Sequence, residues 1–145
     1  MPLFSKRPDA MSRTIKLVEA YSSSDQSMIE LARRELAPVS TMEILQSLYS
    51  LGQLLGKATL TPEQTATLAQ ELEVAADSPE MTAAVQNIGR AILMERSQPA
   101  FVDAVNKYGE PLLGSTSDQL RRMTLLLCAV IGSACRRLEV NFRWK

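Results

Sequence analysis

Few residues in this sequence are suited to catalysis or metal binding. It contains no histidine, which excludes a Ser-His-Asp triad, the usual histidine ligands of zinc and a histidine pH switch. The two cysteines, Cys128 and Cys135, are separated by about 10 Å if they lie two turns apart on one helix, more than a disulfide allows. We therefore expect two reduced, buried thiols, no metal site and no cofactor.

Carboxylate pairs and nucleophile motifs give no catalytic site either. Glu71 and Glu73 are two residues apart on a predicted helix, so their side chains point to different sides. The sequence has no G-x-S-x-G motif and no glycine-rich phosphate loop. The segment "SLGQLLGK" places its glycines within or at the end of a helix, whereas a phosphate loop precedes one. We therefore expect a protein that is not an enzyme.

The C-terminal segment "CRRLEVNFRWK" interleaves cations with aromatic residues. This combination can bind phosphates and stack on bases, or anchor at lipid headgroups. The alternative is that the aromatic side chains fold back onto the core. The N-terminal "MPLFSKRP" extends the same positive surface if the chain ends are close. The predicted anionic-partner-binding residues are Lys6, Arg7, Arg136, Arg137, Arg143, Trp144 and Lys145.

Charge is distributed unevenly although the formal net charge is zero. Residues 1–20 carry four basic and two acidic side chains, residues 118–145 carry six and two, and the middle carries six and twelve. Positive ends can meet the acidic middle of a neighbouring copy, which predicts salt-sensitive, head-to-tail self-association. The zero net charge argues against a dedicated nucleic-acid binder.

The elements that carry these residues are predicted to be helices. Hydrophobic residues make up 46% of the chain and aromatics only 5%, so the core must be aliphatic, which favours helices over strands. Start signals occur at Ser24 or Asp25, at Ser40 with Glu43, at "TPEQ" from Thr61, and at Ser78. We predict about seven amphipathic helices, no strand and no internal repeat.

Three details of this prediction can be compared with the structure. The second helix is expected to use Met28, Leu31, Ala32 and Leu36 as its apolar side. The fourth is expected to extend to about Ala76, and the sixth to end at Gly109 before Pro111. Gly89 lies inside a regular apolar stripe, which suggests that another helix passes close to it.

The segment "RRMTLLLCAVIGSACRR", residues 121–137, has thirteen uncharged residues between arginine pairs. Thirteen helical residues span roughly 20 Å, too little for a bilayer core of about 30 Å. We therefore predict no transmembrane segment and place this helix at the centre of the fold. The alternative is a helix partly buried against a second copy or another protein, with Gly132, Ser133 and Ala134 permitting close approach.

Together these features predict a single compact all-α domain around a central apolar C-terminal helix. Its expected parts are a flexible basic segment at 1–8, a helical domain at 9–140 and a basic-aromatic tail at 141–145.

The predicted function is a non-enzymatic structural or adaptor protein that binds protein partners and itself, with a basic edge for an anionic partner. The alternatives are a nucleic-acid- or nucleoprotein-associated accessory protein, viral or cellular, and a helical-bundle enzyme or ligand carrier. Reduced thiols and the lack of a secretory signal predict an intracellular, cytoplasmic protein.

Overall fold

The computed structural model describes residues 7–55, 61–73, 78–95, 97–113 and 117–137. Over these ranges the chain forms seven uninterrupted helical segments and no strand, which confirms the all-α prediction. The segments are α1 (Arg7–Ser23), α2 (Gln26–Leu36), α3 (Thr41–Leu55), α4 (Pro62–Glu71), α5 (Pro79–Arg90) with a π-helical turn (Ala91–Glu95), α6 (Gln98–Ala104) with a π-helical turn (Val105–Gly109) and α7 (Glu110–Leu113), and α8 (Ser117–Arg137).

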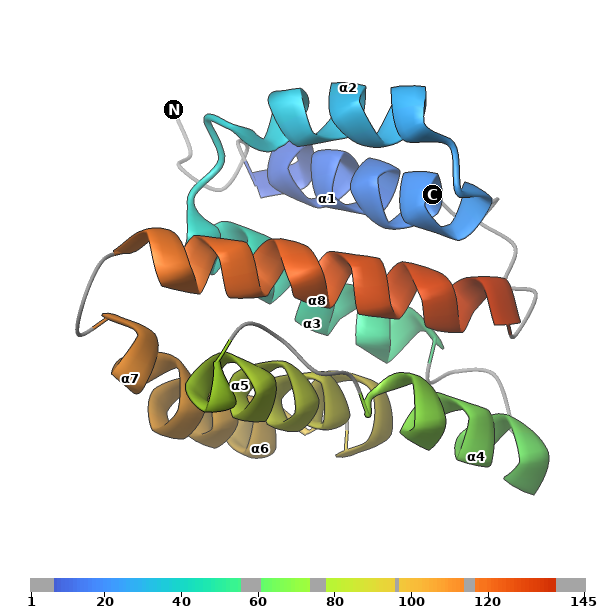
Figure 1. The fold of residues 1–145 in the computed structure, drawn as a ribbon, viewed down its shortest axis with the longest axis vertical. Coiled ribbons are helices and arrows are strands. Elements are labelled where there is room, and N and C mark those ends of the chain that lie inside the picture. The colour runs from blue at the N-terminus through green and yellow to red at the C-terminus, as the bar shows by residue number, and fades with distance from the viewer. Residues whose placement is uncertain (1–6, 56–60, 74–77, 96, 114–116, 138–145) are drawn as a thin grey trace.

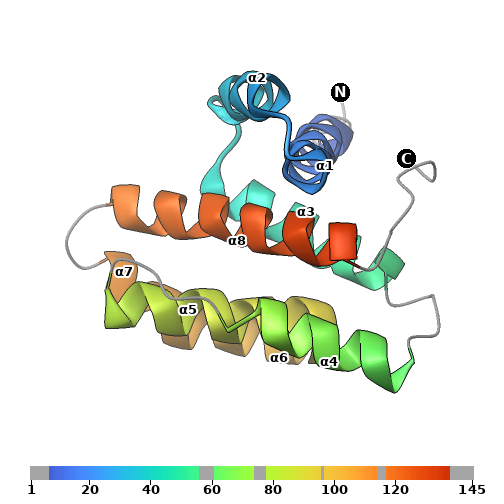
Figure 2. The same cartoon turned by 45° about the vertical axis from the view of Figure 1, so that its right-hand side comes forward.

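The helices form three layers, with α8 and α3 side by side in the middle (Figures 1 and 2). Helices α1 and α2 lie on one side of this pair, and α4 to α7 lie on the other. Helix α8 contacts α1, α3, α4, α5 and α7, so the predicted central position of the C-terminal helix is confirmed. Within the described ranges, no helix combines the length and apolar character needed to span a bilayer.

Local capping signals set the starts of several helices, because the first backbone N–H groups of a helix lack partners within it. The Asp25 carboxylate accepts hydrogen bonds from the N–H groups of Ser27 and Met28 at the start of α2. At the start of α4, Thr61 and Gln64 form the predicted reciprocal capping box. Helix α1 begins at Arg7, two residues before the predicted start.

The predicted end of the sixth helix at Gly109 is wrong. The chain remains helical through Pro111 to Leu113, and none of the described glycines has a positive φ. A π-helical turn precedes α7, so Pro111 enters in the first turn of a new α-helical stretch, where its missing N–H is tolerated. The predicted fourth helix is also too long, since α4 ends at Glu71; residues 74–77 lie outside the described ranges.

Glycines let α8 and α5 approach their neighbours. A Cβ on Gly132 would lie 2.6 Å from the Tyr21 Cβ and 2.7 Å from the Val18 carbonyl oxygen, so α1 packs directly on the α8 backbone. A Cβ on Gly89 would lie 2.6 Å from Leu72, which confirms that another segment passes close there. Gly132 therefore permits close packing of α1 on α8 within the chain, and it does not lie at a surface where a partner could approach.

Helix α2 presents a different face to the core from the one predicted. Its buried residues are Ile29, Ala32 and Leu36, whereas Met28 and Leu31 are 44% and 55% exposed. The correction has a tertiary cause, because α2 packs mainly on α1, which is the helix that lies next to it in Figure 2. A single supporting helix covers only a narrow stripe of α2.

The C-terminal end of α2 is held by an arginine of α8. The Arg121 guanidinium donates hydrogen bonds to the carbonyl oxygens of Leu36, at 2.7 Å, and Val39, at 2.5 Å. Arg13 of α1 donates another to the Glu35 carbonyl oxygen, at 2.6 Å. The Glu35 and Leu36 carbonyls lie in the last turn of α2 and have no partner within the helix, so cations satisfy them and also complement the helix dipole.

Candidate functional site

One side of α8 is only partly covered although the helix lies in the middle layer. In both views α8 lies in front of α3, with no described helix drawn across its outer side (Figures 1 and 2). Leu125, Leu126, Ala129 and Ser133 are half-buried along this side, and Arg122 is exposed. Their spacing of three and four residues places them on one helical face. We call this surface, from Arg122 to Arg137, the open stripe of α8.

A shallow groove of about 200 Å³ borders the open stripe where α8 meets α1 and α2. Its lining residues come from three helices and are Tyr21, Arg33, Arg122, Leu125, Leu126 and Ala129. Leucine and alanine form the apolar part, and the two arginines, both exposed, supply positive charge. A groove of this composition is suited to an apolar side chain flanked by carboxylates or phosphates.

The C-terminal end of the stripe carries two of the predicted site residues. Arg136 donates a hydrogen bond to the Ser24 hydroxyl oxygen, and the Arg137 Nε lies 3.3 Å from a Glu71 carboxylate oxygen. Glu71 also accepts a hydrogen bond from Ser133. Both arginines remain exposed beside these contacts. The structure thus places Arg136 and Arg137 on the same surface as Arg122.

The other predicted site residues do not join this cluster within the described ranges. Arg7 begins α1, whose axis spans about 24 Å before it reaches Ser23. Because Arg136 contacts Ser24, Arg7 begins α1 at the end remote from that contact. Four residues lie outside the described ranges: Lys6, Arg143, Trp144 and Lys145.

Sequence reasoning missed Tyr21, Arg33 and Arg122 as members of this site. Arg122 entered the prediction only as part of an arginine pair that bounds the apolar segment at 121–137. Arg33 carried a usable signal, because it lies in the last turn of α2, where the helix dipole favours cations. Their proximity depends on how α1, α2 and α8 cross, which no local pattern encodes.

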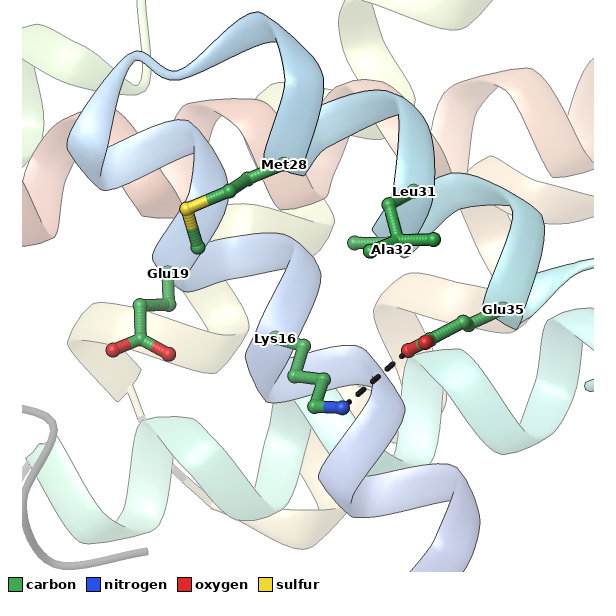
Figure 3. A pocket seen from close by; sticks show the side chains of 6 residues that line it. All are labelled: Lys16, Glu19, Met28, Leu31, Ala32 and Glu35. Atoms are coloured by element: carbon green, nitrogen blue, oxygen red, sulfur yellow. Dashed lines mark ion pairs between the residues drawn. The ribbon is translucent and has the colours of Figure 1, made fainter.

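Among the described residues, two further grooves lie away from α8. The larger, about 330 Å³, separates α1 from α2, with Met28 and Leu31 on the α2 side and Lys16 on the α1 side (Figure 3). There the Lys16 ammonium pairs with the Glu35 carboxylate at 3.6 Å. A smaller groove of about 170 Å³ between α3 and α6 contains the stacked rings of Tyr49 and Phe101, with centroids 4.8 Å apart.

The two cysteine thiols are buried inside the fold. Burial raises the pKa of both Cys128 and Cys135 to about 12, from an ordinary 9.0, although Arg121 acts in the opposite direction on Cys128. Burial also raises the pKa of Tyr21, while Arg33 lowers it. A thiol of such high pKa is protonated near neutrality and is a poor nucleophile. Among the described residues, no three histidine, cysteine or carboxylate side chains are grouped to hold a metal.

Comparisons with protein-family models, curated protein sequences and solved structures find no match.

Proposed function

We propose that this protein is a non-enzymatic interaction module that binds a protein partner along the open stripe of α8. The observation that carries the proposal is the partial exposure of Leu125 and Leu126 in the middle of the helix that otherwise forms the centre of the core. Adjacent positions Leu127 and Cys128 are completely buried. A partner helix or loop that covers the two leucines would complete the burial of α8.

Charge favours an acidic partner at this surface. Arg33 and Arg122 lie beside the two leucines, and Arg136 and Arg137 lie at the end of the stripe. Arginine is common at interfaces because its planar guanidinium pairs with carboxylates and also packs on apolar surface. The basic edge proposed here is therefore part of the docking surface, with the leucines giving affinity and the arginines orientation.

Co-purification from the native source identifies the partner, and comparing the unaltered protein with a variant of the open stripe tests where the partner binds. We expect Leu126→Asp to abolish recovery of the partner, because a carboxylate would then be buried among apolar side chains and repelled by an acidic surface. The matched control is Met42→Asp, which places the same group on an exposed apolar position of α3. Circular dichroism and thermal unfolding of both variants check that the fold is retained.

Recovery of the same partners with Leu126→Asp and with the unaltered protein would refute the proposal. Binding to nucleic acid is the competing outcome, since four arginines on one surface can also contact phosphates. It would appear as retention on heparin that is lost in Arg33→Gln/Arg122→Gln but not in Leu126→Asp. A protein partner requires the leucine as well as the arginines.

A further inference from the structure

We propose that residues 138–145 of this chain fold back and dock in the groove between α1 and α2, with Trp144 beside Leu31. These eight residues follow α8 directly in the sequence and lie outside the described ranges. The inference concerns a different surface from the open stripe, so it does not depend on the proposed function.

The groove between α1 and α2 has an uncovered apolar side among the described residues. Met28 and Leu31 of α2 are exposed, while the buried Ala32 contributes only a methyl group to the lining and leaves room beside them. Figure 3 shows these side chains on α2, across the groove from Lys16 and Glu19 of α1. Large apolar side chains that gather at one surface commonly mark a place where another segment packs.

The sequence of residues 138–145, LEVNFRWK, alternates strictly between apolar and polar side chains. The apolar residues are Leu138, Val140, Phe142 and Trp144. In an extended chain, side chains two positions apart point to the same side, so this pattern gives the segment one continuous apolar face. Such a face is suited to packing along a groove, where an aromatic side chain buries a large apolar area.

The segment starts close to one end of the groove. Arg136, at the end of α8, donates a hydrogen bond to Ser24, in the turn that joins α1 to α2. Leu31 is seven positions beyond Ser24, or about 10 Å along α2. Trp144 follows Arg137 by seven positions and can be about 23 Å from it in an extended chain. That reach is enough to pass the turn and enter the groove.

Charge also favours this groove. Residues 138–145 carry two cations, Arg143 and Lys145, and one carboxylate, Glu139. The groove lining carries the reverse, two carboxylates and one ammonium, with Glu19 near the end that the segment reaches first. Opposite net charges attract the segment, and the long cationic side chains can bend to the rim while their stems stay on apolar surface.

The other two grooves are less suitable. The groove beside the open stripe is lined by Arg33 and Arg122 and by no carboxylate, so it repels a basic segment. The groove between α3 and α6 has no charged residue in its lining. It also begins at Met42, next to Thr41, which contacts Arg121 near the opposite end of α8. Of the three, only the groove between α1 and α2 has both the charge and the position that the segment requires.

The test uses the fluorescence of Trp144, the only tryptophan of the chain. We expect the full chain to emit at shorter wavelength than the free peptide LEVNFRWK, and to be quenched less by acrylamide. Both differences arise when the indole is shielded from water. The same values at low and high protein concentration are expected, because the segment docks within its own chain.

Two variants with matched substitutions locate the docked segment. Met28→Lys/Leu31→Lys places two ammonium groups in the groove, and we expect its emission and quenching to change to those of the free peptide. The control is Met42→Lys/Val102→Lys, which alters two similarly exposed apolar residues in the groove between α3 and α6 and should keep the shielded emission. Circular dichroism of both variants checks that the helices are retained.

Emission and quenching of the unaltered chain equal to those of the free peptide would overturn the inference. Shielding that persists in Met28→Lys/Leu31→Lys would place the segment at another surface and would overturn it too, as would an equal loss of shielding in the control. Shielding that appears only at high protein concentration would mean docking on a second copy, which contradicts docking within the chain.

The open-stripe variant separates this inference from the proposed function. Leu126→Asp should keep the shielded Trp144 emission even where it abolishes recovery of a partner, because the stripe and the groove are different surfaces. Loss of shielding in Leu126→Asp would place the segment on the open stripe and overturn the inference.

Discussion

The inner and outer faces of α8 are similar in residue type but differ in their surroundings. On the inner face, Leu127, Cys128 and Ile131 are completely buried, and Gly132 admits the backbone of α1. On the outer face, Leu126 and Ala129 are half-buried beside the exposed Arg122. An apolar helix face is therefore not sufficient evidence of burial. Burial depends on whether another helix arrives to cover that face.

High pH should lower the stability of the fold mainly through the inner face of α8, because that face contains the two buried thiols. Burial raises the pKa of both thiols from 9.0 to about 12, so the folded state holds these protons more tightly than the unfolded chain. Their contribution to stability is complete below pH 9 and is lost as pH rises from about 9 to about 12. The free energy of unfolding should fall by up to about 1.4 kcal/mol per pH unit for each thiol.

Urea unfolding at a series of pH values measures this dependence. The control is Cys128→Ala/Cys135→Ala, whose stability should decline less steeply over the same window. Some decline should remain, because Tyr21 also has a raised pKa. Equal slopes for the two proteins would mean that the thiols are not shielded from water by the inner face.

Truncation of neighbouring leucines compares the two faces directly. Leu127→Ala should lower the free energy of unfolding by about 3 kcal/mol, because it leaves a cavity in a completely buried site. Leu126→Ala should lower it by about 1 kcal/mol or less, because solvent already reaches that side chain. Chemical denaturation of the two variants measures the difference. Equal losses would show that the outer face is covered in solution.

A smaller effect is expected from adding one methyl group to a glycine. Gly132→Ala should destabilise the fold by about 2 kcal/mol, because the new Cβ meets the Val18 carbonyl oxygen and α1 must shift. Gly109→Ala is the control, since its Cβ would lie 3.6 Å from Leu120, an ordinary contact. There the better helix propensity of alanine should leave stability unchanged or raise it by up to about 1 kcal/mol.

Thermal and urea unfolding both report on these glycine variants. A stable Gly132→Ala protein would show that α1 and α8 are less closely packed than the structure describes. Because both substitutions add the same atoms to a helical glycine, the difference between them isolates the effect of the close approach at Gly132.

The candidate site was only partly predictable. Arg136 and Arg137 were expected to form a basic edge, and both lie on the open stripe. Their pairing with Ser24 and Glu71 was not expected, because those partners are 112 and 66 positions away in the chain. Tyr21 and Arg33 entered the site only through the crossing of α1, α2 and α8. The predicted function and self-association remain predictions.

The sequence by itself determined the helices and many of their starts. Capping contacts such as Asp25 with Met28, or Thr61 with Gln64, join residues three positions apart, so local residue order is enough to specify them. The aliphatic composition and helical periodicity likewise specified an all-α domain with an apolar helix near its end.

Only the tertiary structure decided which apolar faces are covered. Met28 and Ile29 are adjacent and similarly apolar, yet Ile29 is buried against the core and Met28 is exposed. Arg121 donates a hydrogen bond to the Leu36 carbonyl oxygen at the end of α2, while the adjacent Arg122 lines the groove between α8, α1 and α2. Helical periodicity predicts which face of a helix a residue lies on. That face becomes buried only if another segment packs on it, and such packing depends on contacts between segments far apart in the chain.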